Sequence, residues 1–414
     1  TGLASADSAN LLMRILQAPA SWLRAGVTLN PSFPLRNVIR DTFDATVFSQ
    51  YGMKPWDVIG GIAHAIKKDE TYARWLASGG GQATTLWQDR NYSKILRDGI
   101  RQRRIPTPMQ ALQAFSETIE SGPRIAEYTR ALQALGSSVQ GRERALAAGF
   151  ASRNVTIDFS KAGTAGKQLN RISAFWNAAV QGDVRVVEAF KKAPRETSIR
   201  AMGWITLPSL ALWAVNHNDP SYYELPEWRR DTMWNIKAGG QWISIPKPFL
   251  LGYLFGSMPE RFLDWATRSG EVNAQDILSG FAAVAIPDPT PTVITPFIEY
   301  ATNFDLYFQR PVVPESEQDL MPADQYGPGT SEFAQLLGRG VAALPGAEYS
   351  RLASPRVIEN TLSDLVGGGG MAAVDLASDA LRTTGVVASG GAQPARTPPD
   401  IPIAGAFIAR DAAQ

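Results

Sequence analysis

The chain has 414 residues, and its 40 Lys and Arg against 39 Asp and Glu give a formal net charge of +1. This balance excludes a strongly basic protein that would attract nucleic acid or anionic membranes with its whole surface. Charged residues are 19% of the chain, below the ~25% usual for soluble domains, whereas 44% are hydrophobic. We therefore expect a folded chain that buries apolar surface against partners as well as against itself.

Cysteine is absent from the sequence, which excludes disulfides and thiolate metal sites. The two histidines, His64 and His217, are far apart, which argues against a His-based zinc site. We expect His64 on an apolar helix and His217 in a turn, both in packing roles. The chain opens at Thr1 instead of Met and shows no basic leader before an apolar run, so we expect a processed protein or a fragment.

Residues 1–160 form a predicted N-terminal helical region. Apolar residues from Leu11 to Leu23 recur at near-helical spacing, with Pro19 as an interruption, and Pro31 and Pro34 predict an extended elbow. Further helical patterns cover 36–51, 56–68, 109–135 and 143–150, with breaks expected at Gly79–Gly81 and Gly122-Pro123.

Residues 161–385 form a second helical region, with arms rich in Pro and aromatic residues. Helices are predicted over 167–192, 250–268, 331–340 and 355–366, the last ended by Gly367–Gly370. The alternation in Gln241–Pro246 after Gly239-Gly240 predicts one small β-hairpin near 235–245. Closely spaced prolines from Ile286 to Pro296 predict an irregular arm. The fold class is all-α, mainly helical, with this single hairpin.

Residues 386–414 are predicted to form a Gly/Ala/Pro-rich linker and an apolar C-terminal tail, Ile401–Ile408. We expect this tail to lie in a groove of this chain or of a neighbour.

The most apolar stretch, Ala201–Val215, is shorter than the ~20 residues of a membrane span and contains Pro208, so it does not predict a membrane helix.

No catalytic, cofactor-binding or metal-binding constellation is found in the sequence. Gly163–Gln168 has two residues between its glycines and Gln after its Lys, unlike a phosphate-binding P-loop. The Gly-x-Ser-x-Gly and His-Glu-x-x-His patterns are absent, and the acidic pairs have the spacing of solvated helix faces. Arg97, Arg101 and Arg104 follow one another at helical spacing as candidate phosphate contacts, although a solvated or protein-facing surface is the favoured alternative.

The segment from Tyr222 to Phe255 is the most distinctive part of the chain. In Ile245–Phe249, Lys247 lies between two prolines that fix the backbone. A rigid, aromatic segment is typical of a packing or docking surface.

Several ordered segments resemble a large polyvalent protein-associated domain of bacteriophages. The residues that carry this resemblance are Asn30–Phe33, Arg36-Asn37, Arg40-Asp41, Leu207–Ser209, Asn216, Asp219–Tyr222, Leu225–Trp228, Ile245–Phe249, Gly252, Phe255-Gly256, Pro259–Arg261, Asn303–Asp305, Phe308, Arg310–Pro314, Asp324–Tyr326, Thr330–Glu332, Ser354-Pro355, Ile401-Pro402 and Phe407. They span positions 28 to 410 and keep their order.

The resemblance implies a domain of very long phage proteins that are similar to internal virion or ejection proteins. It implies localisation in the virion, in the capsid interior or tail, and in the host cell envelope after ejection. The implied partners are other copies of the chain and phage portal, tail or ejection proteins, with genomic DNA and host membrane as further candidates. The resemblance carries over no catalytic residue and no cofactor.

From these observations we expect a non-enzymatic virion component that aids genome delivery. Its protein-interaction residues are expected to be Lys247, Phe249, Phe297, Phe304, Phe308, Arg310 and Phe407. One alternative is a membrane-active protein that forms channels as an oligomer, since the apolar segments are too short to span singly. A second is part of a cell-wall lytic enzyme whose catalytic domain lies outside this sequence.

Overall fold

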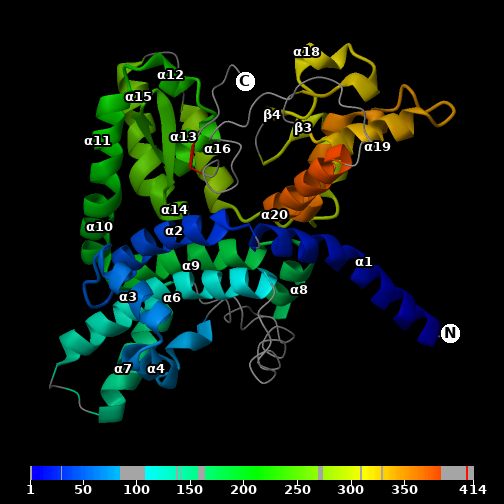
Figure 1. The fold of residues 1–414 in the computed structure, drawn as a ribbon. Coiled ribbons are helices and arrows are strands. Elements are labelled where there is room, and N and C mark those ends of the chain that lie inside the picture. Colours follow the sequence, from blue (N-terminus) through cyan, green and yellow to red (C-terminus); the bar gives the residue numbers. More distant parts are fainter. Residues whose placement is uncertain are drawn as a thin grey trace. The chain divides into compact units, whose positions relative to one another are not determined.

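The computed structural model describes residues 2–28, 30–83, 108–136, 139, 141–156, 164–268, 274–307, 310–327, 330–383 and 407–408. The protein is mainly helical, as predicted, and its named strands form two small antiparallel pairs (Figure 1). The chain folds into two compact units. Unit 1 contains Thr1–Asn30, Thr164–Trp176 and Asp288–Pro402, and unit 2 contains Pro31–Gly163, Asn177–Pro287 and Ile403–Gln414.

Unit 1 is built around two long helices. Its helices are α1 (Gly2–Thr28), α8 (Thr164–Ile172), α17 (Thr295–Thr302), α18 (Glu315–Gln318), α19 (Glu332–Ala342) and α20 (Pro355–Thr383). Strands β3 (Phe304–Asp305) and β4 (Arg310–Pro311) pair in antiparallel register. Helix α1 packs along α20 so closely that a Cβ on Gly26 would lie 1.5 Å from the Val366 carbonyl oxygen. Glycine is therefore required where these helices cross.

The glycine run in α20 corrects a sequence prediction. We expected Gly367–Gly370 to end the helix, but only Gly367 leaves the helical conformation, with φ 60° and ψ −176°. The helix resumes and continues to Thr383, because the missing side chains let α20 pack against α1, where a Cβ on Gly369 would lie 2.2 Å from the Gly26 carbonyl oxygen. Pro19 likewise lies inside the continuous helix α1.

Unit 2 combines helical layers with a β-hairpin. Its helices are α2 (Ser32–Phe48), α3 (Asp57–Lys67), α4 (Glu70–Ala77), α6 (Pro108–Leu135), α7 (Gly141–Asn154), α9 (Trp176–Lys192), α10 (Pro194–Ala201), α11 (Leu207–Asn216), α12 (Pro220–Tyr223), α13 (Glu227–Thr232), α14 (Phe249–Gly252), α15 (Met258–Thr267) and α16 (Ala274–Ala285). Two π-helical turns, η4 (Met202–Thr206) and η5 (Tyr253–Ser257), join α10 to α11 and α14 to α15.

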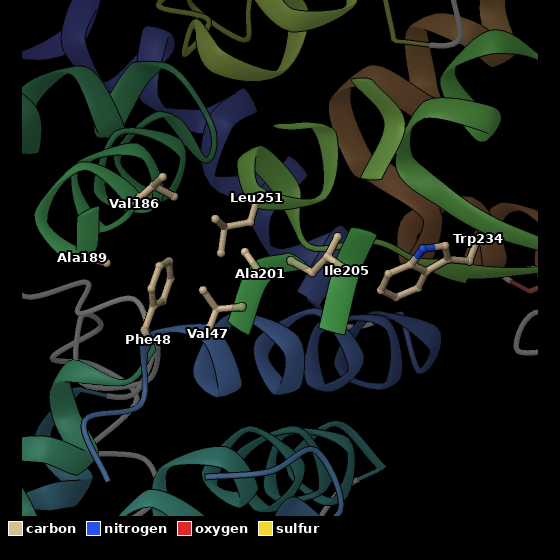
Figure 2. Packing of buried hydrophobic residues seen from close by; sticks show 8 residues of the cluster. All are labelled: Val47, Phe48, Val186, Ala189, Ala201, Ile205, Trp234 and Leu251. Atoms are coloured by element: carbon tan, nitrogen blue, oxygen red, sulfur yellow. The ribbon is translucent and has the colours of Figure 1, made fainter. Parts of the chain in front are cut away.

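One core cluster of unit 2 gathers residues that are distant in sequence. Figure 2 shows Val47 and Phe48 of α2, Val186 and Ala189 of α9, Ala201, Ile205, Trp234 and Leu251. Phe43 of α2 meets Trp234 edge to face, with ring centroids 4.8 Å apart. This packing fixes the hairpin and the π-helical turns against α2 and α9.

Two breakpoints in unit 2 differ from the sequence prediction. Gly122-Pro123 does not interrupt α6, which contains Pro123 in its interior. Gly122 instead lets α3 approach, since a Cβ there would lie 2.5 Å from Cγ1 of Ile62. The single helix expected over 167–192 is two helices, α8 and α9, separated at Phe175, whose φ is 64°.

The predicted hairpin is confirmed. Strand β1 (Met233–Ala238) pairs with β2 (Gln241–Pro246), from Met233 opposite Pro246 to Ala238 opposite Gln241. Gly239 and Gly240 form the two-residue turn, with φ of 59° and 81°. Positive φ at both positions is the geometry of tight hairpin turns and explains the Gly-Gly pair.

Candidate functional site

Lys247 follows β2 and points into the interior of unit 2. The whole residue is 2% exposed, and its ammonium donates to Glu260 Oε2 at 2.7 Å and to Ser257 Oγ at 3.0 Å. It also lies 3.3 Å from the Arg230 carbonyl oxygen. Three acceptors therefore satisfy the three N–H groups of the buried cation.

Two glycines make the groove in which the Lys247 side chain lies. A Cβ on Gly252 would lie 2.7 Å from Lys247 Cβ, and a Cβ on Gly256 would lie 3.5 Å from Lys247 Cδ. The glycines are four residues apart, so both face the same side of the helical segment α14–η5. The aliphatic part of the Lys247 side chain lies beside these two glycines, so that its ammonium reaches Ser257 and Glu260.

A second ion pair extends this buried network. Arg261 forms a bidentate pair with Asp231, with distances of 2.6 and 2.8 Å, and Ser257 Oγ donates to the Asp231 carbonyl oxygen. Burial lowers the pKa of Arg261, but its bonds to Asp231 outweigh burial and leave the pKa raised. Burial raises the pKa of Glu260 above its usual range, and the ammonium of Lys247 opposes that rise.

The network joins the end of β2 to α13, η5 and α15. Its charges are paired with each other, as buried charges must be to offset their desolvation. We expected Lys247 on a surface that contacts other proteins, but the structure places it inside unit 2, where its ammonium is bound by its own chain. The network therefore stabilises the fold of unit 2 by holding these segments together.

A group of exposed apolar side chains occurs in unit 1, from Ile294, which precedes α17, to the turn that follows β3. Phe297 is 70% exposed and Tyr307 is 73% exposed. Ile294, Phe304 and Leu306 are also exposed. We call these five residues the α17–β3 surface. They include the expected contact residues Phe297 and Phe304.

The backbone of the α17–β3 surface is held by polar side chains. Glu299, which is 1% exposed, accepts the Leu306 amide at 2.8 Å. Asn303 adopts a left-handed conformation and exchanges hydrogen bonds with the backbone of Val313 at 3.0 Å each. The Arg351 guanidinium donates to Asn303 Oδ1 at 3.1 Å. The exposed side chains are therefore carried by an ordered frame.

The other expected contact residues are distributed over both units. Phe249 is 56% exposed, with the Arg40 guanidinium 4.4 Å from its ring centroid. Arg310 is exposed on β4, and Phe407 is half-buried beside β2. Phe308 and the candidate phosphate contacts Arg97, Arg101 and Arg104 lie outside the described residues.

Both histidines are involved in contacts within the chain. His64 Nδ1 lies 2.7 Å from Asp69 Oδ2, and Asp69 also accepts the Tyr72 amide to cap α4. His217 stacks on Trp213 with ring centroids 4.4 Å apart. These contacts agree with the packing roles expected from the sequence.

An acidic pair lies in unit 1 between α17 and α20. Burial and the neighbouring charge of Glu299 together raise the pKa of Asp364 to about 8. The Asn360 amide donates to Glu299.

Among the residues that the structure describes, no group of three or more His, Asp or Glu is arranged to hold a metal ion. None of the described helices is long and apolar enough to cross a membrane.

Several members of the buried network were missed as site residues. Glu260 and Arg261 stand in a motif that the sequence analysis singled out, but Ser257 and Asp231 do not. The available signal was spacing, because Gly252, Gly256 and Glu260 recur every four residues and share one helix side. Tyr307 was missed because neighbouring aromatic residues gave no sign of which would be exposed.

Comparison with known proteins gives one family match. Residues 219–404 match the family described as large polyvalent protein associated domain 38. The match confirms the resemblance over this part of the chain and contains both the Lys247 network and the α17–β3 surface. No curated protein and no solved structure matches the chain.

Proposed function

We propose that this chain, whose residues 219–404 form a large polyvalent protein associated domain, is a non-enzymatic structural component of a bacteriophage virion. It would be an internal or ejection protein that assembles with copies of itself and with portal or tail proteins and aids genome delivery. The family match supports the phage association, and the α17–β3 surface supports the assembly role.

The α17–β3 surface is the observation that carries this proposal. Large aromatic side chains bury about 150–250 Å² each and dominate interface energies. A stable interface covers about 800 Å² per partner, so this surface can supply much of the apolar centre of one. Held on an ordered frame, it costs little conformational entropy on binding.

The proposal is tested by the mass of the full chain in solution. We expect concentration-dependent oligomers by light scattering and a loss of assembly in Phe297→Ser/Tyr307→Ser. Trp22→Ser is the matched control, because Trp22 is 56% exposed on α1 of the same unit. A double variant that assembles like the wild type would contradict the role of this surface.

A second candidate function, membrane activity, is favoured by an apolar helix side in unit 2. Ile199, Met202, Leu207 and Val215, on the segment α10–η4–α11, are between 55% and 76% exposed. No charged residue occurs between Ala201 and Val215. Dye leakage from vesicles that Leu207→Ser abolishes would support membrane insertion, and intact vesicles would contradict it.

A further inference from the structure

The outer edge of β2 contacts a segment of the predicted apolar tail. Ile243 of β2 forms an antiparallel bridge with Ile408, and the Ser244 amide donates to the Phe407 carbonyl oxygen at 2.6 Å. The Phe407–Ile408 segment therefore pairs with the outer edge of β2 through one bridge and one further backbone hydrogen bond. The hairpin and this segment both belong to unit 2.

Buried polar groups hold the backbone of the β2 edge in place at this contact. The Ser244 side chain is fully buried, donates to Asn235 Oδ1 at 2.7 Å and accepts from Arg229 at 3.1 Å. These bonds hold the backbone at position 244, so its amide presents the same geometry to any strand that arrives. Strand addition to such an edge is a common mode of peptide binding.

The edge also lacks the features that prevent pairing. Natural edge strands are protected by charged side chains, prolines or bulges. From Gln241 to Ile245, β2 has no charged residue and no proline, and Ile243 is 36% exposed.

We propose that the outer edge of β2 is a strand-binding site, and that in the assembled protein the Phe407–Ile408 segment of a second copy of this chain fills it. This inference rests on the assembly proposed above. Within one chain the contact is a single bridge, which a chemically identical strand from a neighbour replaces without loss. Residues 384–406, which join α20 to the segment, span up to about 75 Å when extended, enough to reach a neighbouring molecule.

The absence of native cysteine allows a direct test by disulfide trapping. Ile243 and Ile408 face each other as a non-hydrogen-bonded pair, in which Cα atoms are about 4.5 Å apart, within the range of a disulfide. Chains carrying Ile243→Cys and chains of different length carrying Ile408→Cys are mixed, oxidised gently and separated without reductant. We expect a disulfide-linked heterodimer.

Ile236→Cys is the matched control in place of Ile243→Cys. Ile236 is 37% exposed and lies opposite Ile243, but on β1. A heterodimer several-fold more abundant with Ile243→Cys than with Ile236→Cys supports exchange. Equal yields overturn it, as does a double variant Ile243→Cys/Ile408→Cys that closes only within one chain while the mixture stays monomeric.

Light scattering of the wild-type chain separates this inference from the proposed function. Wild-type oligomers without a specific heterodimer leave the assembly role standing and refute strand exchange. A wild-type chain that stays monomeric at all concentrations contradicts the assembly role itself.

Discussion

The Lys247–Glu260 pair allows a quantitative test of the buried network. Lys247→Met keeps most of the aliphatic stem beside Gly252 and Gly256 but removes the cation that pairs with Glu260 at 2.7 Å. Breaking a buried ion pair by removing one partner costs about 3–5 kcal/mol, because the other charge stays buried without compensation. We expect a loss of that size in the free energy of unfolding.

Lys237→Met is the matched control, because it removes a lysine from the same hairpin. Lys237 pairs with Asp219 at 2.5 Å, but its side chain is 39% exposed. Exposed ion pairs contribute about 0–1 kcal/mol, so this variant should unfold nearly like the wild type. Urea unfolding followed by tryptophan fluorescence measures both effects, with Trp234 packed in the core of unit 2.

The pH dependence of the stability of Lys247→Met provides a second test of this pair. Without the Lys247 cation, which lowers the pKa of Glu260, burial and the charge of Asp231 raise that pKa further above its ordinary value. Since the folded variant then holds a proton that the unfolded chain releases, its stability falls as pH rises above about 4.3. The variant should lose least at low pH. A loss of unfolding free energy equal to that of Lys237→Met, or one independent of pH, would refute the stabilising role of the network.

Three further predictions concern other parts of the chain. Gly252→Ala should destabilise unit 2 by about 1–3 kcal/mol in urea unfolding, because the added Cβ would lie 2.7 Å from Cβ of Lys247. Gly203→Ala is the control and should leave the stability unchanged, because a Cβ there has no neighbouring atom within 4 Å. The carboxyl of Asp364 has a pKa raised to about 8 by burial and by Glu299, so wild-type stability falls as pH rises from about 4 through 8; Asp364→Asn should reduce this fall in thermal unfolding at several pH values. Truncation after Ala388 should lower the oligomer mass in light scattering, and an unchanged mass would count against a role of the removed residues in assembly.

Local signals made the hairpin predictable from the sequence. Alternating side chains and a Gly-Gly pair fix β1 and β2 with little help from the rest of the chain. The same local reasoning failed at Pro123, because one lost backbone hydrogen bond is outweighed by the packing of α6 against α3. It failed at Phe175 because a left-handed conformation in a residue other than glycine leaves no mark in the sequence.

The burial of Lys247 could not be predicted from composition or from its own neighbours. A lysine between two prolines reads as an exposed, rigid contact residue, since lysine is rarely buried. Its burial depends on a glycine strip that begins five residues later and on Glu260, thirteen residues later. The motif was thus correctly singled out, whereas the direction in which its side chain points required the tertiary structure.

The interleaving of the two units has a consequence for limited proteolysis. The chain passes from one unit to the other after Asn30, Gly163, Trp176, Pro287 and Pro402. A single cut therefore cannot release either unit as an intact fragment. The matched stretch 219–404, cut out by itself, would leave behind α2 and α9, whose side chains cover Trp234 and Leu251. The stretch that matches the family and the segments that fold together are therefore different sets of residues.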